Sequence, residues 1–302
     1  MTERCNLNCI YCHREGVGSQ TGEELTPEEF ERIVRVAARL GVRKVKVTGG
    51  EPLLRSDITD IVGRIARVPG ILEVSLTTNG VNLADHARRL KETGLSRVNI
   101  NLVSLNPETY QKITGLPVLD KVLSGVREAE EAGLTPIKLN VVVLRGLNDG
   151  EIGGFIDFIE GRDIILQLIE LERVGCGDSI YSQYYRDLGA IEAELRSRAE
   201  RVDIKPLHNR RVYHLNGGRV KVEMVRPFHN SEFCMNCRRL RVTADGKLKP
   251  CLMRTDNHVD ILPILRRGGN FDEEALEDAF RRVVEAREPY YPTYLLKTRK
   301  TG

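Results

Sequence analysis

Three cysteines near the start of the chain have the spacing of iron–sulfur ligands. Cys5, Cys9 and Cys12 form a C-x3-C-x2-C pattern. Thiolates are the usual protein ligands of such clusters, and a cubane has four irons, so three cysteines leave one iron open to a small molecule. Structural zinc is the alternative, but a closed zinc site takes four ligands, and His13 is too close to Cys12 to chelate comfortably. The pattern favours a [4Fe–4S] cluster with one exchangeable iron.

A second group of three cysteines lies near the other end of the chain. Cys234, Cys237 and Cys251 form a C-x2-C-x13-C pattern. Zinc ribbons usually have two C-x2-C pairs, and only one such pair occurs here. His229 and His258 could complete a zinc site, so zinc remains an alternative for this group.

A further motif accompanies the first cysteine group. Tyr11 precedes its last cysteine, and Thr48-Gly49-Gly50-Glu51-Pro52 follows downstream. Together these motifs resemble those of the radical S-adenosylmethionine (SAM) superfamily. The resemblance implies that the open iron binds SAM and that one electron cleaves it to a 5′-deoxyadenosyl radical. It also implies that Tyr11 lies near the adenine, that Gly50 lets the methionyl part approach the backbone, and that Glu51 accepts from the SAM amino group.

The second cysteine group narrows this resemblance. Residues 233–243, Phe-Cys-Met-Asn-Cys-Arg-Arg-Leu-Arg-Val-Thr, resemble the GTP 3′,8-cyclases of molybdenum cofactor (molybdopterin) biosynthesis, and the likeness runs from Cys5 to about Met253. It implies a second [4Fe–4S] cluster on Cys234, Cys237 and Cys251, whose open iron binds guanine. It also implies a lyase that converts GTP to (8S)-3′,8-cyclo-7,8-dihydroguanosine 5′-triphosphate, in which the radical removes the ribose 3′ hydrogen and C3′ attacks C8. One bound nucleotide holds both carbons, so ring closure is effectively unimolecular.

Several residues are candidates for binding GTP. Arg239 and Arg241 alternate in an expected strand, which would place both on one face, and a guanidinium suits phosphate or guanine acceptors; a solvated basic strand is the alternative. Lys138 is a cation within an apolar strand pattern and needs a partner there. The resemblance implies that Lys138 binds phosphate, that Lys46 replaces an arginine that contacts the nucleotide, and that Thr77 occupies a nucleotide-binding position.

The chain departs from the family pattern at several positions. Asn101 stands where relatives have serine and Val103 where they have aspartate. Asn101 can still bind a SAM ribose hydroxyl or carboxylate, whereas Val103 cannot replace a carboxylate. Gln167 and Glu172 replace the arginine and methionine of bacterial members, which resembles an archaeal branch. The ending Lys300-Thr301-Gly302 lacks the Gly-Gly tail of bacterial relatives, and we expect the natural start to lie upstream, where relatives have a first strand.

The composition is that of an ordinary globular protein. The 302 residues are 41% hydrophobic and 29% charged, enough for one large domain or two smaller ones. A net charge of +3 is too mild to indicate nucleic acid binding. No apolar run approaches the ~20 residues of a membrane helix, and the first residues are no signal peptide, so we expect a cytoplasmic location. The seven cysteines then indicate metal ligands rather than disulfides, with Cys176 interpreted as structural.

The hydrophobic pattern predicts alternating helices and strands. A helix beginning at Thr26-Pro27 is followed by strands at 42–47, 72–76, 98–102, 137–143 and 164–169, with helices between them at 57–68, 84–93, 120–132 and 151–160. Such alternation indicates a parallel sheet, whose active site lies at the carboxyl ends of the strands. We therefore predict an α/β fold, a partial (β/α)6 radical-SAM barrel over 1–175, and a C-terminal α+β extension over 176–302 that carries the second cluster. The extension is expected to contain a helix at 181–200, two strands within 202–225 and a helix at 273–288.

The predicted function is that of a GTP 3′,8-cyclase with two [4Fe–4S] clusters and SAM. The expected partners are GTP, an electron donor and the downstream cyclic pyranopterin monophosphate synthase accessory protein, without nucleic acid or membrane, and with a homodimer as one alternative. A radical-SAM enzyme that modifies a peptide or another nucleotide is a second hypothesis, although such enzymes usually have more auxiliary cysteines. A non-catalytic iron–sulfur or zinc binding module is a third, and it would leave the Thr-Gly-Gly-Glu-Pro motif unexplained.

Overall fold

A curved eight-stranded sheet forms the centre of the protein. The computed structural model describes all residues except 13–23, 174–176, 228–229, 255, 268–270 and 289–302. The strand order is β1-β2-β3-β4-β5-β8-β7-β6. Strands β1 to β5 and β8 run parallel to one another, whereas β7 is antiparallel to β8 and β6 is antiparallel to β7. The strands are β1 (Lys44–Val47), β2 (Glu73–Thr78), β3 (Arg97–Asn101), β4 (Ile137–Val143), β5 (Ile164–Glu170), β6 (Arg201–Lys205), β7 (Arg210–Leu215) and β8 (Val220–Val225).

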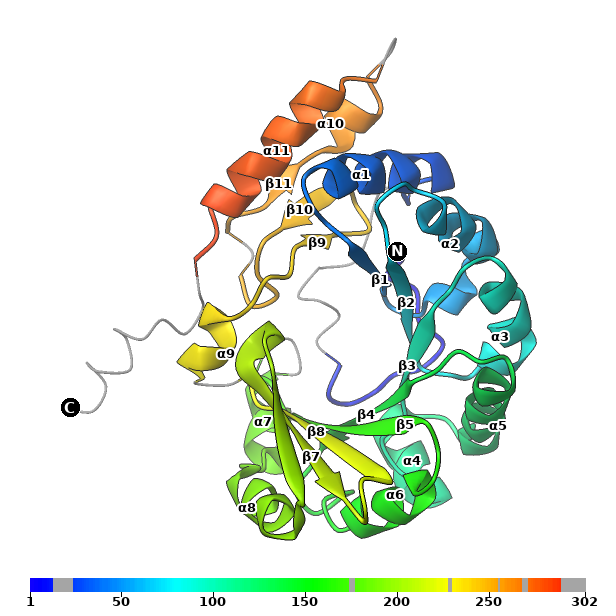
Figure 1. Ribbon diagram of the computed structural model, residues 1–302, viewed down its shortest axis with the longest axis vertical. Helices are drawn as coiled ribbons and strands as arrows, with labels where there is room; N and C mark the ends of the chain where they lie inside the picture. The colour runs from blue at the N-terminus through cyan, green and yellow to red at the C-terminus, as the bar shows by residue number, and fades with distance from the viewer. Residues whose placement is uncertain (13–23, 174–176, 228–229, 255, 268–270, 289–302) are drawn as a thin grey trace, which may run out of the picture.

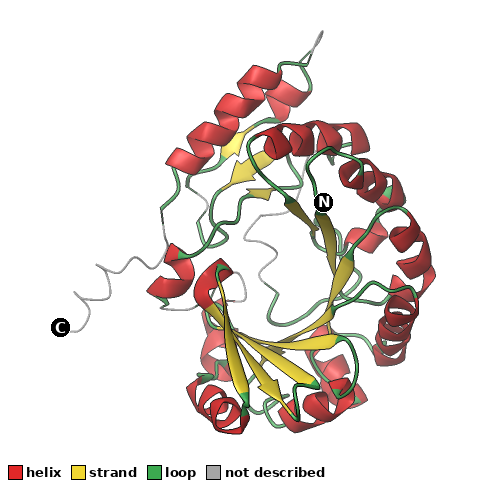
Figure 2. Cartoon of the chain, viewed as in Figure 1, coloured by secondary structure: helices red, strands yellow, loops and turns green. Residues whose placement is uncertain are grey.

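Helices cover the outside of this sheet, so the strands surround an interior region (Figures 1 and 2). The main helices are α1 (Pro27–Arg39), α2 (Ile58–Ala66), α3 (Leu83–Glu92), α4 (Pro107–Thr114), α5 (Leu119–Glu131), α6 (Ile152–Ile159), α7 (Gly177–Tyr184) and α8 (Gly189–Arg198). The predicted start of α1 is confirmed. The Thr26 hydroxyl accepts from the Glu29 N–H at 3.2 Å and the Glu29 carboxylate accepts from the Thr26 N–H at 2.8 Å, a complete capping box.

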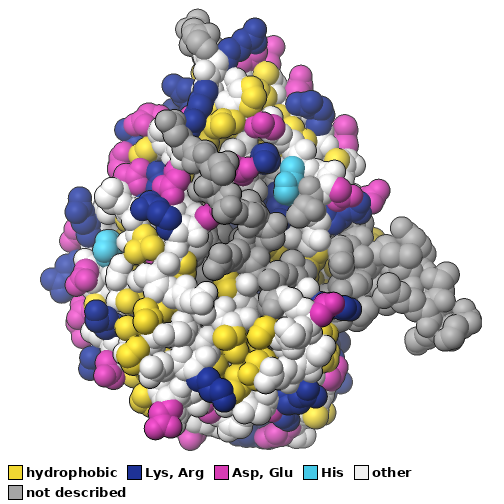
Figure 3. Space-filling model, turned by 180° about the vertical axis from the view of Figure 1, so that it is seen from behind, with side chains coloured by type: hydrophobic (Ala, Val, Ile, Leu, Met, Phe, Trp, Pro, Cys, Tyr) yellow, Lys and Arg dark blue, Asp and Glu magenta, His cyan; other side chains and the backbone are white. Residues whose placement is uncertain are grey.

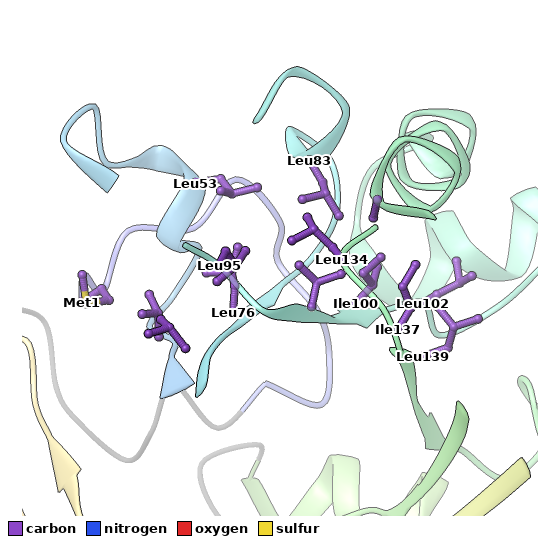
Figure 4. Packing of buried hydrophobic residues seen from close by; sticks show 14 of the residues in the cluster. Met1, Leu53, Leu76, Leu83, Leu95, Ile100, Leu102, Leu134, Ile137 and Leu139 are labelled. Carbon is purple, nitrogen blue, oxygen red and sulfur yellow. The ribbon is translucent and has the colours of Figure 1, made fainter. Parts of the chain in front are cut away.

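The two faces of the sheet have opposite chemistry. Successive side chains of a strand point to opposite faces, and the apolar set packs outward against the helices. Leu76, Ile100, Ile137 and Leu139 belong to this core, together with Leu83 and Leu134 (Figure 4). The alternate set is polar and lies in adjacent register, from Lys46 beside Ser75 to Asn101 beside Asn140 and Gln167 beside Glu223. This inward set gives the barrel a polar lining.

The C-terminal part adds a second, smaller sheet against α1. It has the order β11-β10-β9, with β9 at Arg241–Val242, β10 at Lys247–Lys249 and β11 at Val259–Asp260. A turn at Ala244–Lys247 joins β9 to β10. Helices α9 (Ser231–Met235), α10 (Leu262–Leu265) and α11 (Glu273–Glu285) complete it. Arg39 of α1 pairs with Glu273 of α11, and the Arg266 Nε lies 2.8 Å from Glu29 Oε1. These ion pairs and the side-by-side placement of α1 and α11 (Figure 1) fix the small sheet beside β1.

Three predicted elements differ in the structure. The single helix expected at 181–200 is two helices, because the Asp187 carboxylate accepts from the Gly189 N–H at 2.6 Å and starts α8 separately. The segment 202–225, where two strands were expected, contains three, of which β7 and β8 form a hairpin at Asn216–Gly218. Strand β8 also pairs with β5, so the sheet continues past residue 175 and its sixth parallel strand comes from 220–225.

The surface is mixed in charge. On the face shown in Figure 3, basic and acidic side chains are interspersed, consistent with the small net charge. No helix among the described residues is long and apolar enough to cross a membrane.

Candidate active site

The first cysteine segment is fixed to the end of α4 by backbone hydrogen bonds. The Asn8 N–H donates to the Thr114 carbonyl and the Ile10 N–H to the Ile113 carbonyl, both at 3.0 Å. The Cys12 N–H donates to the Cys9 carbonyl at 3.0 Å, which closes a turn between these two ligand candidates. The segment is thereby held at the edge where the parallel strands end.

The residues before Cys5 run along the Thr-Gly-Gly-Glu-Pro turn. The Gly50 N–H donates to the Thr2 carbonyl at 2.6 Å and the Glu51 N–H to the Arg4 carbonyl at 2.7 Å. A Cβ at Gly50 would lie 2.3 Å from the Arg4 carbonyl oxygen and 2.7 Å from that of Glu3. Glycine is therefore required here by the protein's own backbone. The approach of SAM to Gly50 remains a prediction, and the contact with the Arg4 and Glu3 carbonyls is a separate reason for glycine at this position.

Glu51 is buried, with 1% of its surface exposed. Its carboxylate accepts from the Leu53 N–H at 3.0 Å, the Thr78 hydroxyl at 2.7 Å and the Asn79 N–H at 2.7 Å. Burial raises the pKa of Glu51, and the hydrogen bonds from Asn79, Leu53 and Thr78 partly offset that effect. Its carboxylate thus joins the turn after β1 to the turn after β2, and the predicted contact with the SAM amino group stays a prediction.

The turn after β2 also reaches the cysteine segment. The Asn79 side-chain amide donates to the Asn6 side-chain oxygen at 2.7 Å and lies 3.9 Å from the Cys5 sulfur. Burial and the neighbouring Cys12 raise the pKa of Cys9 to about 12, and burial raises that of Cys5. Burial and the Cys9 thiolate likewise raise the pKa of Tyr11.

These thiols fit an iron–sulfur cluster by their chemistry. A thiolate with a raised pKa needs a compensating positive centre, which iron supplies on binding. Among the described residues, no three His, Cys, Asp or Glu side chains converge on a point where a single metal ion could bind. In a cubane each cysteine binds a different iron, so a cluster does not require such convergence. His13, Cys176 and His229 lie outside the described residues.

The other SAM and nucleotide candidates line the inner face of the sheet. Asn101 accepts from the Asn140 side-chain amide at 2.9 Å. Val103 is buried in the core. Its side chain is apolar and cannot replace the carboxylate that relatives have at this position. Thr77 is half-buried on β2 in register with Asn99 of β3.

The predicted basic residues gather inside the barrel. Desolvation of the Lys46 ammonium, together with the nearby charges of Arg97 and Arg239, lowers the pKa of Lys46 to about 7. The Lys46 side chain nevertheless remains accessible to solvent. Burial likewise lowers the pKa of Lys138. Burial lowers the pKa of Arg239 to about 10, aided by the adjacent charges of Arg210 and Arg241. Because these cations repel one another, the barrel interior is suited to binding a polyanion.

The arginine prediction is wrong in one detail. The expected strand through both residues begins only at Arg241, so Arg239 lies in the loop before β9. The reason is that α9 and its turn occupy the chain up to Asn236, where the Cys237 N–H donates to the Cys234 carbonyl at 3.2 Å. A short loop then leads to β9.

The second cysteine group is supported by a buried aromatic stack. The His208 ring stacks on Phe233, next to Cys234, with centroids 3.9 Å apart. Burial and the charges of Arg239 and Arg210 lower the pKa of His208 to about 2, which keeps the imidazole neutral. The stack fixes α9 against residues 207–209.

Sequence reasoning missed a buried acid and two of the three cations around it, although it identified Lys138 and its need for a partner. Glu223 on β8 is fully buried and pairs with Lys138, Lys205 and Arg210. The alternation Lys221-Val222-Glu223-Met224 resembles that of a strand with one solvated face, so the pattern gave no indication that Glu223 is enclosed. The available clue was that Glu223 stands two residues after Lys221, which places both polar side chains on the same face of a barrel strand.

Comparison with known proteins agrees with this arrangement. Residues 1–159 match the radical SAM superfamily and residues 164–293 match the family described as Molybdenum Cofactor Synthesis C. The chain belongs to the radical SAM superfamily. Membership implies a [4Fe–4S] cluster and SAM, and it identifies the protein as a radical SAM enzyme.

Curated relatives resemble the chain over nearly its whole length. A "Probable GTP 3′,8-cyclase" of Methanosarcina mazei is 49% identical over 99% of this chain and 88% of the relative. One of Thermococcus kodakarensis is 46% identical over 96% of this chain and 94% of the relative. The fold also matches Streptococcus suis SuiB bound to S-adenosylmethionine, with a TM-score of 0.61 and 17% identity, over 95% of this chain and 64% of SuiB.

Proposed function

We propose that this radical SAM enzyme is a GTP 3′,8-cyclase of molybdenum cofactor biosynthesis. The observation that carries the proposal is the gathering of Lys46, Lys138, Arg239 and Arg241, from both parts of the chain, around one barrel interior. A triphosphate needs such a concentration of cations. The names of the relatives support the same activity.

The chain's own residues supply binding and positioning. Cys5, Cys9 and Cys12 would hold the first [4Fe–4S] cluster, with SAM bound by Tyr11, Gly50, Glu51 and Asn101. When bound, the cluster and SAM supply the radical that removes the ribose 3′ hydrogen. Lys46, Thr77, Lys138, Arg239 and Arg241 would hold GTP so that C3′ faces C8.

A second [4Fe–4S] cluster on Cys234, Cys237 and Cys251 is part of the proposal. Cys237 and Arg239 lie close enough to affect one another electrostatically, which supports a guanine site next to a phosphate site. An external electron donor would supply one electron for SAM cleavage and a second electron that, with a proton, reduces the cyclised radical to the dihydro product. The downstream cyclic pyranopterin monophosphate synthase accessory protein would use that product.

The test is anaerobic reconstitution with iron and sulfide, then incubation with SAM, dithionite and GTP. Two cubanes predict about eight irons per chain. The products should be 5′-deoxyadenosine and a GTP isomer of unchanged mass, separated by chromatography and detected by mass spectrometry. Deoxyadenosine formed independently of GTP, with GTP unchanged, would refute the cyclase and leave a radical SAM enzyme with another substrate.

A further inference from the structure

Three cations from three strands share one buried carboxylate. Glu223 Oε2 lies 2.5 Å from the Lys138 Nζ and 2.8 Å from the Lys205 Nζ, and Oε1 lies 2.8 Å from Arg210 Nη1. The Glu223 side chain has no exposed surface. Lys138 is on β4, Lys205 ends β6 and Arg210 begins β7.

The group is positively charged as a whole. With all three cations protonated, one carboxylate neutralises one of them and leaves two positive charges next to the buried Glu223 and Arg210, where electrostatic interactions are stronger than in water. The Lys205 side chain lies at the edge of the group and is 36% exposed. Buried charges are normally paired, so an excess of cations in such a place indicates a site for an anion that arrives from outside.

Arg210 connects this group to the second cysteine region. The His208 N–H, two residues before Arg210, donates to the Asn236 carbonyl at 3.0 Å, and the Asn209 side-chain amide donates to the Glu232 carboxylate at 2.8 Å. Residues 208–210 thus link the barrel wall to the second cysteine pair.

We propose that Lys205 and Arg210 bind the phosphate chain of the nucleotide together with Lys138, and that Glu223 positions all three cations. The proposal rests on the proposed cyclase function and assigns its phosphate subsite. Without Glu223, two lysines and an arginine would repel one another and move apart.

The geometry leaves donors for a ligand. A guanidinium has five N–H donors in a planar fork. Arg210 Nη1 forms an ion pair with Glu223 Oε1 at 2.8 Å, and the Arg210 Nε lies 3.5 Å from the Leu207 carbonyl. The Lys205 side chain is 36% exposed, and an ammonium has three donors. Phosphate oxygens can therefore bind beside Glu223 without displacing it.

Strand β7 offers a matched pair of variants for the test. Arg210→Gln removes the proposed contact, whereas Arg211→Gln changes the next residue, which points to the opposite face and pairs with Glu192 at 3.3 Å. Lys205→Gln is a second test variant, because its partly exposed position tolerates the change. Thermal unfolding of each variant would be measured first, to check that it is folded.

Dissociation constants would be measured with reconstituted protein for GTP, GMP, guanosine and inorganic tripolyphosphate at one fixed ionic strength. Arg210→Gln and Lys205→Gln should each weaken GTP and tripolyphosphate binding by about 10- to 100-fold, the range for a lost charged hydrogen bond. Guanosine binding should be unchanged, and Arg211→Gln should match the wild type for every ligand.

The two proposals fail in different ways. If the wild type binds tripolyphosphate through Arg210 but neither binds nor converts GTP, the cyclase function is overturned and the anion site stands. If GTP is converted but Arg210→Gln binds all ligands like Arg211→Gln, the phosphate subsite is overturned. Equal weakening of guanosine and GTP by Arg210→Gln would also overturn it, because that result indicates general damage to the site.

Discussion

Replacing Gly50 by alanine should release the segment that leads into the first cysteine group. The new Cβ would lie 2.3 Å from the Arg4 carbonyl oxygen, and backbone cannot rotate away as a long side chain can. Residues 2–4 must therefore shift, which breaks the hydrogen bonds from the Gly50 and Glu51 N–H groups to Thr2 and Arg4. Cys5 follows directly and moves with them.

The size of the effect follows from these contacts. Two backbone hydrogen bonds contribute about 2 kcal/mol, and overpacking adds about 1 to 3 kcal/mol. A loss of about 3 to 5 kcal/mol corresponds to a fall in unfolding temperature of roughly 6 to 20 °C for a chain of this size. Misplacement of Cys5 should also lower the iron content after reconstitution.

The assay compares iron per chain, SAM binding and thermal unfolding for Gly50→Ala and a control. Gly153→Ala is suitable, because a Cβ there meets no atom within 4 Å and the residue lies inside α6. The control should be neutral or slightly stabilising. If Gly50→Ala loads iron and unfolds like the wild type but fails to bind SAM, our backbone argument is wrong and the close approach of SAM explains the glycine.

Three further predictions concern the second cluster, the buried acid and the first helix. Cys237→Ala should lose about half of the reconstituted iron and abolish GTP conversion while SAM cleavage persists; unchanged iron content would contradict a second cluster. Burial acts to raise the pKa of Glu223, but Lys138, Arg210 and Lys205 outweigh it and lower the pKa to about 2. Because this value is below the unfolded value near 4.3, its stabilisation is present above that value and is lost as pH falls toward about 2, so Glu223→Gln should flatten the acid dependence of urea unfolding. Thr26→Ala should cost about 1 kcal/mol in the same assay, and a loss near zero would mean that the capping box contributes nothing measurable.

Local patterns in the sequence were sufficient for most of the barrel. Strands β1 to β5 and most of the helices between them follow from periodicity and end signals, because each depends on adjacent residues. Helix α4 was not predicted. The pairing of β8 with β5 depends on residues more than fifty positions apart, and no local pattern encodes such a register. For this reason the sixth parallel strand was not predicted.

The candidate site was predicted to a similar extent. Glu51 could be identified because it belongs to a superfamily motif, and Arg239 because residues 233–243 resemble the GTP 3′,8-cyclases. Arg210, Lys205 and Glu223 belong to no spacing pattern, and their importance arises only because their side chains meet Lys138 of β4 in space. The contact of Gly50 with the backbone before Cys5 could not be predicted either, since the sequence does not show which backbone atoms a glycine faces.

The late arrival of β8 has a consequence for how the protein is made. During synthesis the chain emerges from its N-terminus, and β1 to β5 can associate as each βα unit appears. Strand β5 then presents an unpaired edge until residues 220–225 emerge, and exposed edges of this kind promote aggregation. Closure over so long a connection is slow relative to the local steps. We expect that a nascent or truncated chain ending near residue 175 precipitates, and that iron loading of the two cysteine groups is separated in time by this closing step.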